Sequence, residues 1–167
     1  AVEILEERVR RGSEDADQLV LNVSEGAALE AVTRDQLAQI DVLTKQAAIA
    51  AAARKDQTKA NLKSALLRVI DAAPDMDEGR IAQELALIAV KTDVTEELDR
   101  LRAHITAAHA LLDDPKPVGR KLDFLSQEFN REANTLCSKA QSTELTAIGL
   151  DLKAVIDQLR EQIQNVE

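Results

Sequence analysis

The scarcity of helix breakers constrains the fold of this chain more than any other feature. Its 167 residues include five Gly and three Pro, whereas residues of high helix propensity are abundant. Residues 18–73 are rich in Ala and keep apolar side chains three or four positions apart, which is the spacing of one face of an α-helix. The alternation of apolar and polar residues that marks a strand does not occur. The pattern predicts an all-α protein with long helices.

The apolar residues favour close packing between helices. They make up 45% of the chain, yet only Phe124 and Phe129 are aromatic. A compact globule of this length usually has more aromatic anchors, whereas Ala, Leu, Ile and Val suit closely packed helices. We therefore expect an elongated antiparallel hairpin or bundle, which completes its apolar stripes as a homo-oligomer through the last two helices.

Polar and Pro-containing clusters predict where the helices end. Residues 12–17 are polar and begin with Gly, Pro74 is expected to end a helix, and residues 113–117 hold two Pro. The predicted helices cover residues 1–11, 18–73 (as one helix or two joined helices), 78–112, 118–139 and about 143–166.

Capping residues and domain limits follow from the same clusters. Asp75 or Asp77 is expected to cap the helix that starts at 78, and Ser142 or Thr143 the last helix. We divide the chain into an N-terminal segment that we do not place, a long helical region and a C-terminal helical domain, over residues 1–18, 19–77 and 78–167.

Charge and cysteine content limit the classes of function. The formal net charge is -9, so RNA contacts must come from local basic groups or from another domain, because the overall field repels nucleic acid. The single cysteine, Cys137, excludes an internal disulfide framework and indicates a reducing compartment. No apolar run is long enough to span a bilayer, and residues 1–11 do not resemble a signal peptide. We expect a cytoplasmic protein that does not act at a membrane.

A first group of polar residues lies on one side of the predicted helix over 78–112. Four residues follow one another at steps of four, three and four, which places them on one helix face: Asp93, Glu97, Arg100 and His104. Carboxylates one turn apart can share a divalent cation, and a nearby His can bind that cation or move a proton. The same pattern is also typical of a solvated face of intrahelical ion pairs.

A second group lies on the predicted helix over 118–139. Glu128 and Glu132 are one turn apart, beside a polar row formed by Gln127, Arg131 and Asn134. Amide side chains are poorer helix formers than Lys, Glu or Ala, so their presence indicates specific hydrogen bonds. The alternative is a polar seam between helices of an oligomer.

The two groups are expected to face each other. The short loop over 113–117 makes the flanking helices antiparallel, and Glu97 and Glu132 lie at nearly equal distances along the chain from Pro115. We therefore predict one metal centre formed by four carboxylates, Asp93, Glu97, Glu128 and Glu132. We expect three residues to be catalytic, with the His as proton shuttle: His104, Glu97 and Glu132.

Basic residues near these groups are candidates for phosphate contacts, because Arg and Lys supply the positive charges that such contacts need. The predicted RNA-binding residues are Arg100, Arg120, Lys121, Arg131 and Lys139. Intrahelical ion pairs with neighbouring acidic residues are the alternative.

Several segments of the second half resemble the YicC family. The resemblance is carried by GRKLDFL, QE, NREANT, SK and the final REQIQNVE, at residues 119–125, 127–128, 130–135, 138–139 and 160–167. Upstream it includes RI, QE and DVTEELDRL, at residues 80–81, 83–84 and 93–101, with His104. The similarity is strong over 78–167 and weaker over 19–77.

The resemblance implies a function. Members of this family are bacterial, cytoplasmic, stress-associated endoribonucleases that cleave RNA with help from a divalent metal, Mn or Mg, and assemble as hexamers. They carry a further N-terminal domain of mixed strands and helices, so we expect this chain to be a C-terminal fragment. The rival interpretation is a non-catalytic helical adaptor that oligomerises and recruits other RNA-decay proteins.

Overall fold

The computed structural model describes the backbone of residues 2–72, 77–115 and 118–164. The side chains of residues 2–25, 27, 56 and 78 are not described. Within these limits the chain is all-α, as predicted, and shows no strand. It has five helices: α1 (Val2–Ala72), α2 (Glu78–Lys91), α3 (Thr95–Leu112), α4 (Gly119–Lys139) and α5 (Thr143–Gln164).

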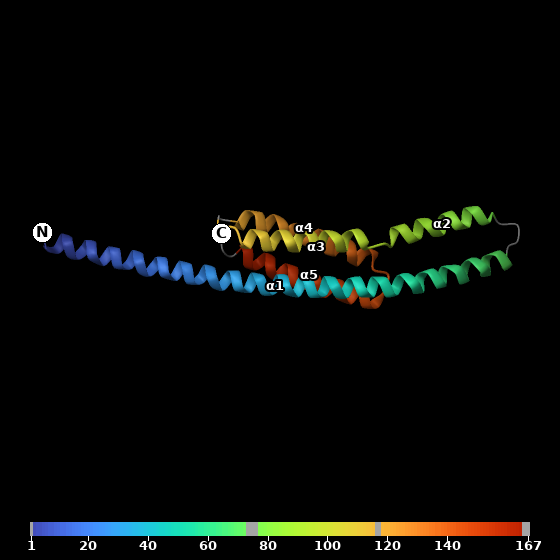
Figure 1. Cartoon of the computed structure of the whole chain (residues 1–167), viewed down its shortest axis with the longest axis horizontal. Coiled ribbons are helices and arrows are strands. Elements are labelled where there is room, and N and C mark those ends of the chain that lie inside the picture. Colours follow the sequence, from blue (N-terminus) through green and yellow to red (C-terminus); the bar gives the residue numbers. More distant parts are fainter. Residues whose placement is uncertain (1, 73–76, 116–117, 165–167) are drawn as a thin grey trace.

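The molecule is elongated along its first helix. Figure 1 shows α1 running the full length, with α3, α4 and α5 packed against its middle part and α2 lying beside its last part. The first turns of α1 extend beyond the bundle. None of the described helices is both long and apolar enough to cross a membrane.

The central part is a four-helix bundle. Each of its helices packs against two others, because α1 contacts α3 and α5, and α4 contacts the same two helices. The core consists of aliphatic side chains and one aromatic ring, and its fully buried members include Leu37, Ile40, Leu101, Phe129, Leu136 and Ile156. Such close packing in an antiparallel bundle is what the Ala-rich and Leu-rich composition predicted.

The first helix contradicts the predicted break over 12–17. The helix is continuous from Val2 to Ala72, so residues 18–72 belong to one helix and not to two, while residue 73 lies outside the described residues. A Gly inside a helix costs only about 1 kcal/mol relative to Ala, whereas Pro costs about 3. The stretch over 12–17 contains one Gly and no Pro, so the helix can continue through it.

The predicted helix over 78–112 is wrong as a single element, because the chain leaves the helix at residues 92–94. The Oδ1 atom of Asp93 accepts hydrogen bonds from the amide of Thr95 (2.9 Å) and from its hydroxyl (2.5 Å). These bonds favour a turn over a continuing helix. The β-branched residues on both sides of Asp93, with low helix propensity, were the signal in the sequence.

Two predicted caps can be decided. The Asp77 carboxylate accepts from the amides of Gly79 and Arg80 and caps α2. The Ser142 hydroxyl accepts from the amide of Leu145 at 3.2 Å and caps α5. Pro74 and Asp75 lie outside the described residues.

Candidate metal centre

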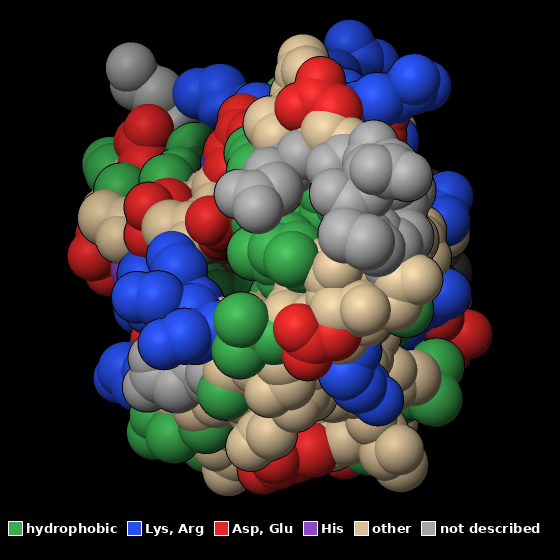
Figure 2. Space-filling model, turned by 90° about the vertical axis from the view of Figure 1, so that its right-hand side faces the viewer, with side chains coloured by type: hydrophobic (Ala, Val, Ile, Leu, Met, Phe, Trp, Pro, Cys, Tyr) green, Lys and Arg blue, Asp and Glu red, His purple; other side chains and the backbone are tan. Residues whose placement is uncertain are grey.

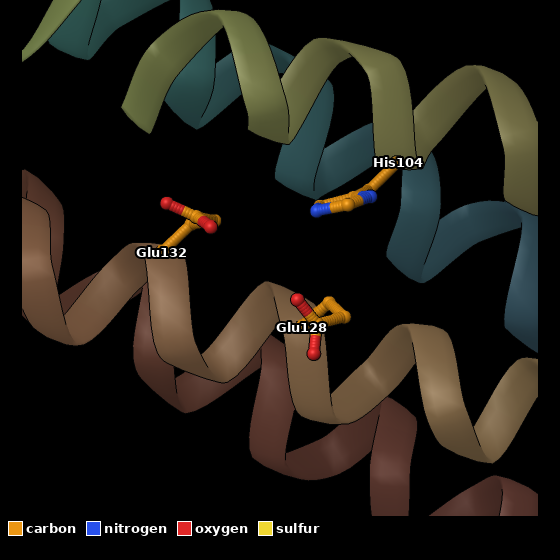
Figure 3. Close-up of side chains that lie close together, drawn as sticks. All are labelled: His104, Glu128 and Glu132. Atoms are coloured by element: carbon orange, nitrogen blue, oxygen red, sulfur yellow. The ribbon is translucent and has the colours of Figure 1, made fainter. Parts of the chain in front are cut away.

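Three side chains converge between α3 and α4. His104 lies on α3, and Glu128 and Glu132 lie one turn apart on α4. One nitrogen of the imidazole and one oxygen of each carboxylate all lie within 4.8 Å of one another. Figure 3 shows the three side chains pointing into the space between the two helices. We call this arrangement the His–Glu–Glu group.

The position of the imidazole is set by packing. The ring of His104 meets the ring of Phe129 edge to face, with centroids 5.8 Å apart and an angle of 81° between the planes. Its Nε2 atom is buried and has no hydrogen-bond partner among the described residues. A buried nitrogen without a partner is unfavourable, unless a bound ligand satisfies it.

One cation compensates the buried carboxylate. Glu132 is only 3% exposed, and its Oε1 accepts a hydrogen bond from Arg100 at 3.3 Å. Arg100 also pairs with Glu96 on its own helix. The hydrogen bond to Glu132, together with the charge of Glu96, raises the pKa of Arg100 above its ordinary value, so this guanidinium stays charged.

The second carboxylate of the group is less confined. The side chain of Glu128 is 26% exposed, and its nearest cation is Arg131, at 3.9 Å on the same helix. The carboxylates of Glu132 and Glu128 are therefore compensated only by Arg100, at 3.3 Å, and by the more distant Arg131, at 3.9 Å, among the described side chains. The remaining negative charge and the unpartnered imidazole nitrogen fit a divalent cation, for which carboxylate oxygen and imidazole nitrogen are suitable ligands.

The structure places Glu97 outside this group. Its Oε1 pairs with Lys139 at 2.7 Å, while its Oε2 is buried without a partner among the described residues. Glu97 precedes His104 by seven residues, or two helical turns, which is a rise of about 10 Å. Lys139 follows Glu132 by the same interval on α4. The pairs Glu97–Lys139 and His104–Glu132 are therefore successive layers of the polar contact between α3 and α4, which we call the seam.

Glu97 therefore lies opposite Lys139, whereas Arg100 and His104 lie opposite Glu132, so the structure does not bring Glu97 and Glu132 together at one height. An antiparallel seam presents the same face every seven residues, and the pattern alone does not decide which layers meet. Asp93 is also outside the group, because its carboxylate accepts hydrogen bonds from Thr95 just before α3 and lies 3.8 Å from Lys55 of α1.

The predicted RNA-binding residues are in different situations. Arg100 and Lys139 bind the buried carboxylates of the seam, and Lys139 also donates to the backbone carbonyl of Asp93. Arg131, Arg120 and Lys121 are exposed on α4. The structure thus assigns two of the five predicted residues a place inside the seam and leaves three on the surface.

Sequence reasoning missed the part that Phe129 plays. From the sequence it was named only as one of two aromatic residues, yet its ring packs edge to face against His104. The sequence shows that Phe129 follows Glu128 directly and precedes Ala133 by one turn. It does not show that the ring meets His104 of the neighbouring helix, because that contact is tertiary.

Fold and site together define a class of protein: an all-helical bundle that holds a buried imidazole and two carboxylates between antiparallel helices. The family model described as "Endoribonuclease YicC-like, C-terminal" matches residues 45–167. The chain belongs to this family, which confirms the resemblance seen in the sequence.

Curated relatives agree with the family model. The chain is 49% identical over 102 residues to a protein of Haemophilus influenzae named "Probable endoribonuclease YicC". It is 39% identical over 109 residues to a protein of the same name from Clostridioides difficile. The matches cover 61% and 65% of this chain and 36% of each relative, so the chain spans about a third of their length.

Proposed function

We propose that this chain is the C-terminal helical part of an endoribonuclease that cleaves RNA with help from a divalent cation. The names of the relatives support RNA as the substrate and phosphodiester cleavage as the reaction. The single observation that carries the metal-assisted mechanism is the convergence of His104, Glu128 and Glu132 within 4.8 Å.

The residues of the group have separate tasks in this proposal. Glu128 and Glu132 would hold the cation through carboxylate oxygens, and His104 would offer its buried Nε2, which has no partner among the described residues. Arg100 holds Glu132 in place through a hydrogen bond to its Oε1. A cation bound here would lower the pKa of a bound water and neutralise charge that develops on the phosphate. The mixed nitrogen and oxygen donors favour Mn²⁺ over Mg²⁺, which usually takes oxygen ligands alone.

Exposed basic residues complete the proposal. Arg131 follows Glu128 by three residues, and its side chain is 69% exposed. It can therefore reach a phosphate that approaches the group from solvent. Arg120 and Lys121 lie at the other end of α4, more than two turns away, and would contact RNA beyond the scissile phosphate.

The test replaces single carboxylates by their neutral isosteres. We expect Glu132→Gln to reduce RNA cleavage by at least about 100-fold at saturating Mn²⁺ and to weaken Mn²⁺ binding, because a ligand is lost. Glu84→Gln, an exposed change on α2, is the control for loss of one charge. Cleavage and Mn²⁺ affinity of Glu132→Gln equal to those of the control would contradict the proposal.

The same change at Glu97 decides whether that residue belongs to the centre. We expect Glu97→Gln to keep the Mn²⁺ affinity, because Glu97 lies one layer away and pairs with Lys139. Loss of metal affinity equal to that of Glu132→Gln would place Glu97 in the centre after all.

The wild-type protein also tests the rival function. If RNA stays uncleaved in the presence of the wild-type protein with any divalent metal, the adaptor interpretation is favoured.

A further inference from the structure

A groove opens where the last part of α1 meets the junction between α2 and α3. It has a volume of about 460 Å³, and small residues of α1 (among them Ala48, Ala51 and Ala52) form its floor together with apolar groups of α3. Among the described side chains, four cationic residues and a single carboxylate line it: Arg54, Lys55, Lys59, Arg102 and Asp93. We call it the arm groove.

The charge of this part of α1 is opposite to that of the chain. Residues 54–68 contain five Lys or Arg and one Asp, whereas the whole chain has a formal net charge of -9. Lys55, Lys59 and Lys63 follow at steps of four residues, which is a rise of about 6 Å per step along one side of the helix. Figure 2, viewed onto this end of the molecule, shows separate groups of Lys and Arg side chains on the surface.

The cations of the groove differ in how they are used. Arg54 donates to the backbone carbonyls of Thr92, Lys139 and Ala140, and so ties α1 to the α2–α3 junction and to the end of α4. Lys55 has only a 3.8 Å pair with Asp93, and its side chain is 75% exposed. Lys59 forms no ion pair with a described side chain. Within the described side chains, the positive charges of Lys55 and Lys59 are thus largely uncompensated.

The arm groove also lies close to the His–Glu–Glu group. Thr95, Leu98 and Arg102 of α3 line the groove, while Arg100 and His104 of the same helix face α4. The first turns of α3 therefore separate the two sites. A ligand that extends beyond the groove would need to pass only this short stretch of helix to reach the group.

We propose that the arm groove binds the phosphate backbone of a single-stranded RNA segment through Lys55 and Lys59; this proposal rests on RNA being the substrate. Lysines repeated at each helical turn suit a polymer of regularly spaced negative charges. The small apolar residues of the lining leave room for bases beside the lysines, and because contacts to phosphates carry no sequence information, we expect binding without base preference.

The first test measures the affinity for a fluorescently labelled single-stranded RNA by anisotropy in EDTA, so that neither metal nor cleavage enters. We expect Lys59→Gln to weaken binding about fivefold at 0.1 M salt and to reduce the salt slope by about 0.7, because one phosphate contact is lost. The matched control is Lys45→Gln on the same helix, since Lys45 is exposed and does not line the groove. Equal affinities and slopes for the two variants would overturn the proposal.

A second pair of variants leaves all four cations in place. Ala52 lines the groove and its neighbour Ala53 does not, although both are exposed on α1. We expect Ala52→Glu to weaken RNA binding several-fold and Ala53→Glu to change it far less. Equal effects of Ala52→Glu and Ala53→Glu would contradict RNA binding in the arm groove. Displacement of the RNA by a polyglutamate peptide at the same concentration of charge would contradict it as well, because it would show that any polyanion binds there equally well. If these binding results hold but Glu132→Gln cleaves normally, the proposed centre fails and the groove stands.

Discussion

At the residue scale, the seam between α3 and α4 carries two kinds of buried carboxylate. Glu97 is closely paired with Lys139, so its charge is balanced within the protein. Glu132 shares Arg100 with Glu96, and Glu128 lies near only a distant cation. The ion pair of Glu97 with Lys139 is therefore suited to stabilise the folded state. The carboxylates beside His104 keep more uncompensated negative charge, which suits them to bind a cation.

A prediction about stability follows for the Glu97–Lys139 layer. We expect Lys139→Met to lower the free energy of unfolding by about 2–4 kcal/mol, because Glu97 is then left as a buried charge without a partner. The double variant Lys139→Met/Glu97→Met should recover most of this loss, since no charge remains to be desolvated. Urea unfolding of both variants measures the difference, and a single variant as stable as the wild type would disprove the assignment.

At the element scale, the interruption between α2 and α3 separates two parts of the molecule. On one side lies the four-helix bundle, and on the other α2 packs mainly on α1, with Leu87 and Ile88 about half exposed and Val90 largely exposed. Asp93 and Arg54 fix the junction through backbone hydrogen bonds. The junction thus forms one wall of the arm groove and also sets where α3 begins.

A pH-dependent prediction belongs to this junction. The hydroxyl and amide of Thr95 donate to the Asp93 carboxylate and hold its pKa below the ordinary value. A lowered pKa means that the carboxylate stabilises the fold above its unfolded pKa of about 4 and that this contribution disappears as pH falls through the lowered value. We expect Asp93→Ala to lower the free energy of unfolding at pH 7, because both hydrogen bonds from Thr95 are lost.

Thermal unfolding at several pH values checks this prediction. The difference between wild type and Asp93→Ala should be constant near neutral pH and shrink below about pH 4. A difference that grows on acidification would show that the ionised Asp93 carboxylate is not the form that accepts the hydrogen bonds from Thr95.

The elements differ in how well the sequence predicts them. The limits of α4 and α5 follow from the loop over 113–117 and the Ser142 cap, because turn chemistry acts locally. The interruption at residues 92–94 depends on one Asx-type turn within an otherwise helical pattern. The partner of each carboxylate depends on the layer at which α3 and α4 meet, which is a tertiary property. For this reason the His–Glu–Glu group could be predicted only in part.

At the scale of the whole molecule, large apolar side chains remain on the outside of the last two helices. Phe124 of α4 is 61% exposed and Leu150 of α5 is 56% exposed. We keep the prediction of a homo-oligomer through α4 and α5, with a hexamer as the state that the family resemblance implies. An assembly of this kind would bury these side chains.

Sedimentation measures the assembly. We expect the wild-type chain to sediment as a species larger than a monomer at micromolar concentration, and Phe124→Glu and Leu150→Glu to shift it toward the monomer without unfolding it. Ile49→Glu, an exposed change on α1, is the control. A compact wild-type monomer would refute this prediction, and equal effects of all three changes would refute the choice of helices.

The most direct test of the central claim is the position of Mn²⁺ in crystals of the protein, located by anomalous diffraction. We predict a peak between His104 Nε2 and the carboxylates of Glu128 and Glu132, and its loss in Glu132→Gln. Glu97→Gln should keep the peak, because Glu97 belongs to the neighbouring layer with Lys139. A peak beside Glu97 and Asp93, or no peak at a Mn²⁺ concentration that supports RNA cleavage, would contradict the account.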